Sequence, residues 1–530
     1  MILLEEKSLT PLVVVGVYLG LLLAFGMLAK RLLKTSSSDY FVASRSIGPF
    51  LLLMSVFGTT MTAFALVGST GKSFVKGAGV YGLMASASGI IHSAVFFLIG
   101  IKLWAIGKRH NFVTQIQFFR HRFDSSGIGY LLFPMLVGLV IPYLLLGLVG
   151  AGTVVRGITS GMFPDTFSGE LIAATGKIAF VGAVPPWITG LVVCGVVLAY
   201  IIAGGVRAAA MANAAQTIVF MSVGLLAFYL IADALGGLEA ASEKVVQNRP
   251  ELLSRDETIG KMEFMTYMLV PLSVGMFPHL FQHWLTAKSA KTFRVTVIAH
   301  PIFIMIVWVP CVLIGVWAAG EGITVPPGKE NAVLAKTVGV LLKDPFITGL
   351  LMSGILAAIM SSLDSQFVCL GTIFTHDIVI HAKGEDHYTD KQKVMLGRLF
   401  ILFIVAVTYT LSLFPPDSIF DLAVWCFSGF SSLFPLVFAS LYWRRVTRVG
   451  AFASILVAAG TWIYFFYQGL IKPAFAGVKP ADKEDYLIMG MMPVAIMFAA
   501  SALVLIVVSL MTQPPPKSVV DSFFDDRKPS

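Results

Sequence analysis

Apolar stretches long enough to cross a lipid bilayer repeat along almost the whole chain. A helix needs about 20 apolar residues to span a hydrocarbon core of about 30 Å. Windows of that length lie near residues 9–29, 47–70, 79–106, 127–155, 186–206, 211–235, 263–286, 295–319, 346–376, 394–414, 418–443, 449–471 and 487–511. The pattern predicts an all-α polytopic membrane protein with about thirteen transmembrane helices.

Two of these windows contain residues that interrupt a helix. The window 47–70 includes Gly58-Thr59-Thr60-Met61-Thr62, and the window 263–286 includes Pro271 followed by Gly275-Met276-Phe277-Pro278-His279. Proline removes a helix hydrogen bond, and freed backbone survives in a membrane only where it is buried in protein or lines a polar cavity. Either the helices unwind around a binding site, or their small residues serve close helix packing. We expect both helices to unwind.

The window 346–376 contains the polar run Ser361-Ser362-Leu363-Asp364-Ser365-Gln366. Counted from Phe346 at about 1.5 Å per residue, Ser361 lies about 22 Å along the helix, which is deep in the hydrocarbon layer. Hydroxyls and a carboxylate are costly at that depth unless something binds them. The run is therefore the first candidate for a functional site.

The serines of this run have the spacing of an alkali-cation site. Ala358 stands three residues before Ser361 and four before Ser362, so the three lie close together on a helix. A hard cation takes several oxygen ligands, which hydroxyls and freed carbonyls supply. The hydroxyls of Ser361 and Ser362 and the carbonyl of Ala358 are expected to face the break at Gly58 and Met61. Alternatively, the hydroxyls only bond back to carbonyls of the preceding turn.

Composition agrees with a membrane protein. Of 530 residues, 57% are hydrophobic and 13% are charged, and the mean hydropathy is +0.85. The formal net charge is +9, but the basic residues stand in short clusters between the apolar windows, which argues against a nucleic-acid partner. The clusters are Lys30/Arg31/Lys34, Lys108/Arg109/Arg120/Arg122, Lys288/Lys291/Arg294, Lys391/Lys393 and Arg444/Arg445/Arg448. The positive-inside rule then predicts a multi-pass protein of the cell inner (plasma) membrane, with its N-terminus outside and its C-terminus in the cytoplasm.

The sequence lacks the signals that are typical of other classes of membrane protein. A channel calls for a short filter repeat, an intramembrane enzyme for a run such as His-Glu-x-x-His or facing aspartates, and a sensor for a long cytoplasmic domain. None of these is found, so we expect no enzyme activity. The cysteines are isolated within apolar windows and are expected to be packing residues: Cys194, Cys311, Cys369 and Cys426. The start of the chain lacks a basic n-region, so the first helix is expected to be retained.

Several short motifs, taken in their order and spacing, resemble those of the solute:sodium symporter family. They are Asp39-Tyr40-Phe41-Val42-Ala43-Ser44-Arg45-Ser46-Ile47-Gly48-Pro49, Gly204-Gly205-Val206-Arg207-Ala208, Phe277-Pro278-His279, the run from Ala358 to Gln366, and Trp443-Arg444-Arg445. The likeness spans nearly the whole chain. It is closest to the branches that carry monocarboxylates, pantothenate and proline.

The resemblance implies a LeuT-type core of two inverted five-helix repeats. The expected parts are an extra helix and first cytoplasmic loop (1–46), the first repeat (47–235), an extracellular loop (236–262), the second repeat (263–443), two further helices (444–511) and a disordered cytoplasmic tail (512–530). The implied sodium ligands are the carbonyls of Gly58, Met61 and Ala358 and the hydroxyls of Ser361 and Ser362. The expected substrate-binding residues lie at the two breaks and on the fourth helix: Thr60, Thr62, Tyr143, Gly275, Pro278 and His279.

One departure from the family pattern concerns a second cation. Many relatives carry a Trp-Thr-Asp run after the Gly-Gly turn that is associated with a second sodium site, and this chain has Met211-Ala212-Asn213 instead. Asp364 occupies a position that is often a small polar residue in relatives. We therefore expect the carboxylate to stand on the other wall of that site, with Asn213, Asp364 and Ser365 as ligands. Alternatively, Asp364 pairs with a basic residue at a helix end.

The sequence thus predicts a sodium-coupled symporter that imports a small organic solute by alternating access. The Phe277-Pro278-His279 motif resembles the branch that moves monocarboxylates and pantothenate more than the sugar branch, and this resemblance implies a monocarboxylate or a similar organic acid, while an amino acid or a sugar stays open. Arg156 either attracts such an anion or is a loop charge. The expected partners are the solute, Na+ and the lipid bilayer, and the monomer is expected to be functional.

Overall fold

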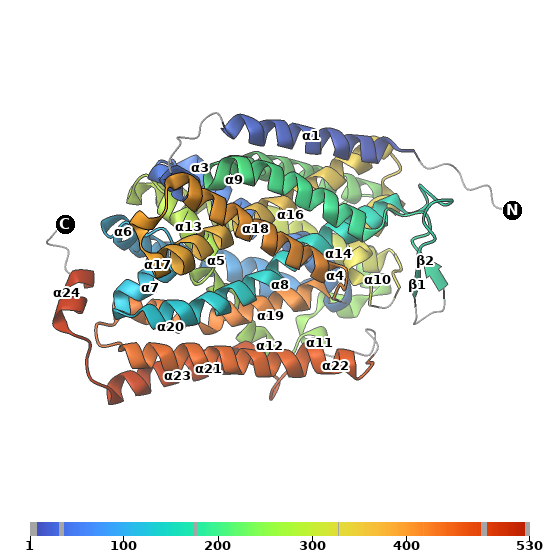
Figure 1. Ribbon diagram of the computed structural model, residues 1–530. Coiled ribbons are helices and arrows are strands. Elements are labelled where there is room, and N and C mark those ends of the chain that lie inside the picture. The colour runs from blue at the N-terminus through green and yellow to red at the C-terminus, as the bar shows by residue number, and fades with distance from the viewer. Residues whose placement is uncertain are drawn as a thin grey trace.

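The computed structural model describes residues 8–30, 37–172, 177–326, 328–416, 418–478 and 485–524. Helices run side by side in one bundle (Figure 1). The α-helices are α1 (Thr10–Lys30), α2 (Ser37–Val42), α3 (Pro49–Thr60), α4 (Ser69–Lys76), α5 (Ala87–Val95), α6 (Ile101–Arg109), α7 (Gln115–Phe123), α8 (Ser126–Thr159), α9 (Pro186–Ala234), α10 (Leu238–Asn248), α11 (Arg255–Thr258), α12 (Lys261–Tyr267), α13 (Pro278–Thr286), α14 (Phe293–Gly320), α15 (Val333–Leu341), α16 (Pro345–Ile373), α17 (His381–Lys383), α18 (Asp390–Ser412), α19 (Ile419–Ser432), α20 (Phe434–Tyr442), α21 (Arg448–Phe466), α22 (Lys472–Phe475), α23 (Pro493–Met511) and α24 (Lys517–Phe524).

Short segments of tighter or wider helix join several of these elements. They are η1 (Ala43–Arg45), η2 (Phe64–Gly68), η3 (Gly77–Gly79), η4 (Gly82–Ser86), η5 (Phe96–Gly100), η6 (Pro250–Leu253), η7 (Val270–Gly275), η8 (Ala290–Thr292), η9 (Glu330–Ala332), η10 (Phe374–Ile380), η11 (Glu385–His387) and η12 (Tyr467–Ile471). Two three-residue strands, β1 (Glu170–Ile172) and β2 (Lys177–Ala179), form an antiparallel hairpin in which Leu171 stands opposite Ile178.

The described helices supply the membrane spans that the sequence predicts. Ten are long and apolar enough to cross a bilayer, and two further spans are bent pairs. In the first pair, Pro49–Thr60 and Phe64–Gly79 meet at 58°; in the second, Lys261–Gly275 and Pro278–Thr286 meet at 49°. Each bent pair begins a run of five spans when α9 is counted as two. That count brings the twelve spans to thirteen.

The helix α9 is two spans because its backbone turns at Gly205, where φ is 54° and ψ is −146°. A Cβ at this glycine would lie 2.3 Å from the carbonyl oxygen of Tyr40, so both the positive φ and the close approach favour glycine. The two halves return to the same end of the bundle. The first begins at Pro186 against the last turns of α8, and the second ends near Phe228, whose ring stacks on Trp317 of α14 at 5.4 Å.

The bundle has two ends, which we name by the elements that cover them (Figure 1). The hairpin face carries β1, β2, α10 and α15, and α4, α8 and α14 end there. The α7 face carries α2, α6, α7, α17 and α24. The centre between the two faces is occupied by α16, of which 83% of the membrane-spanning window lies inside the protein, compared with 22% for α1. The polar run of α16 is therefore enclosed by other helices rather than by lipid.

Two segments differ from the sequence-based expectation. The strands β1 and β2 fall in a connection for which no structure was predicted. In the tail predicted to be disordered, Lys517–Phe524 form α24 (Figure 1), and Phe523 is buried against Phe118 of α7 at a ring distance of 5.3 Å. An aromatic pair that finds a groove on a neighbouring helix can order such a short segment. Residues 525–530 of the predicted tail lie outside the described part.

Candidate functional site

The first bent pair opens beside the serine run of α16. The helix α3 ends at Thr60, and Met61 has extended backbone, with φ −88° and ψ 109°. The next helical segment, η2, begins at Phe64. Because a helix leaves its last carbonyls without partners, the end of α3 presents backbone oxygens inside the bundle. The sequence predicted an interruption over Gly58 to Thr62, and the observed break lies at its C-terminal end, with Gly58 still helical.

Three of the five predicted sodium ligands meet at one point. The hydroxyl of Ser361 is 2.7 Å from the carbonyl oxygen of Gly58 and 2.8 Å from that of Ala358. Ser361, Gly58 and Ala358 are all buried. The Ser362 hydroxyl donates instead to the carbonyl of Ile359 at 2.9 Å, as in the alternative in which such hydroxyls bond back to the preceding turn. Met61 lies at the break itself.

Close helix packing holds the Gly58 carbonyl in this position. A Cβ at Gly58 would lie 2.6 Å from the Thr217 hydroxyl of α9, so only glycine lets α3 approach α9 this closely. Thr217 in turn donates to the carbonyl of Met54, one turn earlier on α3, at 3.1 Å. The contacts with α9 therefore hold the end of α3 in its position next to α16.

A second polar cluster surrounds Asp364, one turn further along α16. Its carboxylate is fully buried and accepts hydrogen bonds from the hydroxyl of Tyr200 at 2.9 Å and from that of Ser365 at 3.1 Å. The amide nitrogen of Asn213 lies 2.8 Å from the Ser365 oxygen, and Nε2 of His283 lies 2.9 Å from it. The structure thus brings together Asn213, Asp364 and Ser365, and it adds Tyr200 and His283.

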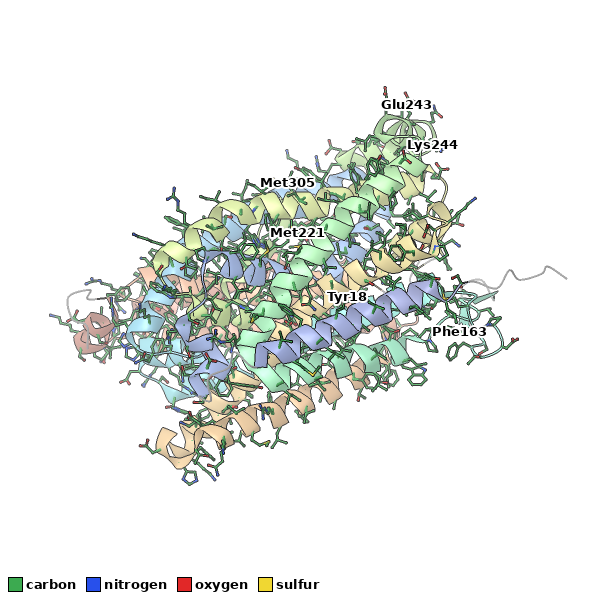
Figure 2. All side chains as sticks on the ribbon, turned by 90° about the horizontal axis from the view of Figure 1, so that it is seen from above. Tyr18, Phe163, Met221, Glu243, Lys244 and Met305 are labelled. Carbon is green, nitrogen blue, oxygen red and sulfur yellow. The ribbon has the colours of Figure 1, made fainter. Side chains whose placement is uncertain are left out.

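Several acceptors and donors of this cluster have no hydrogen-bond partner in the part of the chain that the structure describes. They are Oδ1 of Asn213, Nδ1 of His283, both amide atoms of Gln216 and the hydroxyl of Tyr18, which lies midway along α1 (Figure 2). Within the same part, the ion pairs do not include Asp364. A buried carboxylate without a basic partner calls for a bound cation or a proton.

Sequence reasoning missed Tyr200 and His283. Each is a single polar residue in an otherwise apolar window, and such residues more often serve packing. The signal that points to them is a polar side chain inside an apolar window: Tyr200 lies in the last third of the window 186–206, and His283 follows His279 by one helical turn. The amino-acid sequence alone does not reveal that these two windows meet at Asp364.

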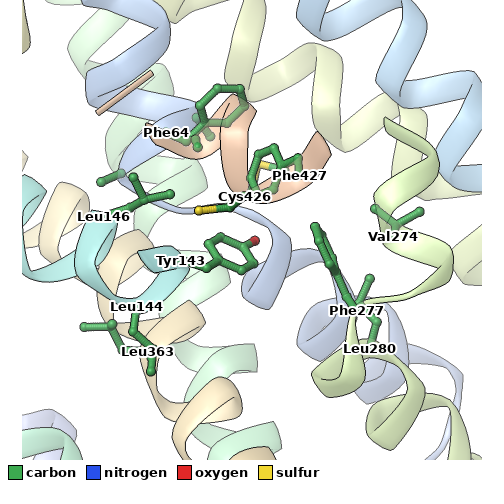
Figure 3. Close-up of a cluster of buried hydrophobic side chains, with 14 of the residues drawn as sticks. Phe64, Tyr143, Leu144, Leu146, Val274, Phe277, Leu280, Leu363, Cys426 and Phe427 are labelled. Carbon is green, nitrogen blue, oxygen red and sulfur yellow. The ribbon is translucent and has the colours of Figure 1, made fainter. Parts of the chain in front are cut away.

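Aromatic side chains fill the space between the two broken helices. Tyr143 of α8 lies 5.3 Å from Phe277, 5.6 Å from His279 and 5.1 Å from Phe427, measured between ring centroids. In Figure 3, Tyr143 and Phe277 lie on opposite sides of the space between the two broken helices, and Phe427 and Cys426 of α19 lie beside them. Phe64, which begins η2, lies 5.2 Å from Phe427. We call these five rings, Phe64, Tyr143, Phe277, His279 and Phe427, the aromatic cluster.

The imidazole of His279 is the unpartnered polar group of the aromatic cluster. The residue is fully buried, and neither ring nitrogen has a hydrogen-bond partner among the described residues. Pro278, the first residue of α13, and His279 follow the break of the second bent pair. A helix start leaves backbone N–H groups free, so this end of α13 can receive a negatively charged group.

The other predicted substrate residues stand at the breaks but bond to their own backbone. The Thr60 hydroxyl donates to the carbonyl of Phe57 at 2.8 Å, and the Thr62 hydroxyl accepts from the N–H of Phe64 at 3.0 Å. Gly275 ends η7 against the ring of Phe434. Arg156 lies apart from the aromatic cluster, over the ring of Phe180 at the hairpin face.

Comparison with solved structures shows the fold. A sodium-coupled sialic acid symporter in a substrate-bound outward-open state matches with a TM-score of 0.72 at 15% identity, covering 96% of this chain and 99% of that one. The nucleobase-cation-symport-1 transporter Mhp1 matches with a TM-score of 0.50 at 16% identity, covering 93% and 98%. The chain has a LeuT-type helical fold.

Sequence comparison identifies the family. Residues 171–458 match the Sodium:solute symporter family. A sodium/proline symporter of Haemophilus influenzae is 28% identical over 97% of this chain and 96% of its own length. The osmoregulated proline transporter OpuE of Bacillus subtilis is 26% identical, covering 88% and 90%, and a sodium/pantothenate symporter of H. influenzae is 24% identical, covering 84% and 87%.

The chain belongs to the sodium:solute symporter family. It is therefore a multi-pass membrane protein that couples an organic solute to sodium, and it is a transporter rather than an enzyme. These findings confirm the predicted family, fold class, coupling ion and lack of enzyme activity.

Proposed function

We propose that the protein imports a small solute bearing one carboxylate, together with Na+ bound by the carbonyls of Gly58, Met61 and Ala358 and the hydroxyls of Ser361 and Ser362. The observation that carries this proposal is the 2.7 Å contact between the Ser361 hydroxyl and the Gly58 carbonyl, which joins α16 to the broken helix α3. A cation at that point binds both helices at once. Oxygen ligands from hydroxyls and carbonyls suit an alkali cation.

Sodium drives import because it stabilises the arrangement that also holds the solute. Inward opening would move Ser361 and Ser362 away from Gly58 and Met61, which releases the ion and the solute together. A sodium ion that crosses about 100 mV gains about 2.3 kcal/mol, and a tenfold gradient adds about 1.4 kcal/mol. One ion therefore sustains a solute accumulation of about five-hundredfold.

The aromatic cluster and the two breaks are the proposed solute site, with Thr60, Thr62, Tyr143, Gly275, Pro278 and His279 at its walls. Within the described residues, no lysine or arginine belongs to this cluster. A solute carboxylate would instead meet the sodium charge and the free N–H groups at the start of α13. The relatives named above transport proline or pantothenate, both of which carry a carboxylate. An organic acid, with amino acids counted among the organic acids, is therefore favoured over a sugar as the solute.

A second sodium ion is proposed at Asn213, Asp364 and Ser365. Within the described chain, Oδ1 of Asn213 lacks a hydrogen-bond partner, and none of the ion pairs includes the Asp364 carboxylate. Both are oxygen atoms that a hard cation accepts as ligands. The ion would neutralise the buried carboxylate and would join α16 to α9.

We further propose that the hairpin face is extracellular and that the monomer transports alone. Basic residues concentrate at the α7 face, where Arg120 and Arg122 of α7 and Arg444 and Arg445 after α20 lie, and such residues favour the cytoplasm. All residues of both proposed sodium sites come from one chain.

Uptake into proteoliposomes tests the function. The purified protein would be reconstituted and offered L-proline, pantothenate, L-lactate and glucose under an inward gradient of Na+, K+ or H+. We expect uptake of at least one of the three carboxylates to follow the Na+ gradient alone and glucose to stay at background. Uptake that follows the H+ gradient, or that favours glucose, would contradict the proposal.

A further inference from the structure

A partly open cavity lies between the aromatic cluster and the hairpin face, apart from both proposed sodium sites. It is lined by residues of α4, η4, α12, the first half of α19, η12 and the segment before α23. Its polar lining includes Lys72, Glu263, Asp421 and Asp485. If the hairpin face is extracellular, a solute on its way to the aromatic cluster crosses this cavity first.

Ion pairs across the cavity hold three separate segments together. Nζ of Lys72 on α4 lies 2.9 Å from the Asp485 carboxylate and 3.4 Å from that of Asp421 on α19. Lys76, one turn later, lies 3.1 Å from the other oxygen of Asp485. Burial raises the pKa of Asp485, but the charges of Lys72 and Lys76 outweigh it and bring the pKa to about 2. The Lys72 side chain is 14% exposed and those of Asp421 and Asp485 are 29% and 25% exposed, so the pairs are partly shielded from water.

Aromatic rings form the remaining walls and lead towards the proposed solute site. Tyr267, Phe420, Trp425 and Tyr486 line the cavity, and Nζ of Lys72 lies 5.1 Å from the Phe420 ring centroid. Phe420 also touches Phe64 of the aromatic cluster, at a centroid distance of 5.1 Å. Phe420 thus stands between the cavity and the cluster. A solute that moves α19 away from α4 would pass from the cavity to the aromatic cluster.

The charge of the cavity discriminates between kinds of solute. Among the residues that the structure describes, its lining carries one positive side chain, Lys72, and three acidic ones, Glu263, Asp421 and Asp485. Separating Lys72 from Asp421 leaves two poorly hydrated charges unpaired, which is costly. A solute carboxylate satisfies only Lys72 and adds a fourth negative charge. A solute with both a carboxylate and an ammonium group satisfies Lys72 and an aspartate together.

We propose that this cavity is a second solute site, which binds a zwitterionic amino acid by exchanging its carboxylate and ammonium groups for the partners in the Lys72–Asp421–Asp485 ion pairs. The inference rests on the sodium-coupled transport proposed above. It narrows the class of solute from carboxylates in general to amino acids. Because the cavity contains neither proposed sodium site, binding here does not require Na+.

Binding without sodium separates this site from the central one. Saturation-transfer NMR on the purified protein in choline chloride buffer would use L-proline and N-acetyl-L-proline as probes, since the second has a carboxylate but no ammonium group. We expect L-proline to bind with a Kd on the order of 1 mM and N-acetyl-L-proline to bind about ten times more weakly. Lys72→Gln and Asp421→Asn should each weaken L-proline binding about tenfold, as the loss of one charged hydrogen bond predicts.

Matched variants make the result decisive. Lys244→Gln removes another lysine of the hairpin face, which Figure 2 labels. Lys244 pairs with Glu321 and does not line the cavity, so this variant should bind L-proline as the unaltered protein does. Sodium-dependent L-proline binding, measured in the same samples, shows that each variant is folded. The inference is overturned if the unaltered protein binds no L-proline without sodium, if N-acetyl-L-proline binds equally well, or if neither cavity substitution weakens binding. Failure of sodium-dependent uptake for every solute would instead overturn the proposed function.

Discussion

The two polar clusters of α16 lie one turn apart and differ in the oxygens that they offer. At Ser361, two backbone carbonyls and a hydroxyl converge, and they join α16 to the broken helix α3. In the cluster around Asp364, hydrogen bonds join side chains, one of them a carboxylate, and the partners outside α16 belong to α9 and α13. The first cluster is neutral and the second carries a formal negative charge.

This difference assigns different tasks to the two proposed ions. A cation held by neutral oxygens keeps its full positive charge, so it can attract a solute carboxylate in a medium of low dielectric constant. A cation at Asp364 is neutralised by its ligand and offers the solute little. It does remove the cost of a buried carboxylate, and so favours the packing of α9 and α13 against α16. The first ion would thus favour solute binding, and the second would favour the packing of α9 and α13 against α16.

Removal of the charge at Asp364 should have the largest effect. Asp364→Asn keeps the shape of the side chain but leaves the second ion without its carboxylate, which we expect to weaken that ion's binding about a hundredfold, or about 2.7 kcal/mol. The Hill coefficient for Na+ in solute uptake should fall from about two to about one, since a single ion then remains.

Asp344→Asn is the matched control for this prediction. Asp344 caps the start of the same helix, where its carboxylate accepts from the N–H groups of Phe346 and Ile347, and asparagine caps equally well. The control should keep the Hill coefficient of the unaltered protein. A coefficient that is the same in Asp364→Asn and in the unaltered protein would refute the second ion.

Loss of the Ser361 hydroxyl should have the next largest effect. Ser361→Ala removes one neutral ligand of the first ion, so the Na+ concentration for half-maximal uptake should rise about tenfold. Solute affinity at saturating Na+ should change little. Ser353→Ala is the control, because Ser353 is buried in the same helix and its hydroxyl also bonds back, to Gly349 at 2.9 Å. If both alanine variants shift the sodium requirement equally, the Ser361 hydroxyl serves packing alone.

The comparison also shows how far sequence reasoning reaches. Long apolar windows predict the spans well, because the bilayer sets a length that composition reveals. The Ser361 contact with Gly58 was expected from helical spacing and family resemblance together. The surroundings of Asp364 were expected only in part, since Tyr200 and His283 reach it through tertiary packing of α9 and α13. Helical spacing places residues on one face of a helix but does not identify the helix opposite.

Moving the carboxylate to the opposite wall sharpens the comparison further. The double variant Asp364→Asn with Asn213→Asp returns the acid to the position that relatives use, and Asn213 already lies 2.8 Å from Ser365. We expect the Hill coefficient to return towards two, with the sodium requirement within about fivefold of the unaltered protein. Asp364→Asn with Gln216→Glu is the control, because Gln216 is also buried on α9 but lies one turn away. Recovery in both double variants would mean that any nearby negative charge suffices and that Asn213 is not a ligand.

The smallest effect is expected from the hydroxyl of Tyr200, which supports Asp364 without holding the ion itself. Tyr200→Phe removes the 2.9 Å hydrogen bond to Oδ2 of Asp364 and keeps the ring in its packing. The loss of one hydrogen bond should raise the sodium requirement about threefold, while the Hill coefficient stays near two. Tyr40→Phe is the control, because Tyr40 is also a buried tyrosine next to α9 but donates to the backbone carbonyl of Ile201 at 3.3 Å. A Hill coefficient of one in Tyr200→Phe would make Tyr200 a ligand in its own right. An unchanged sodium requirement would mean that Asn213, Ser365 and the ion position the carboxylate without it.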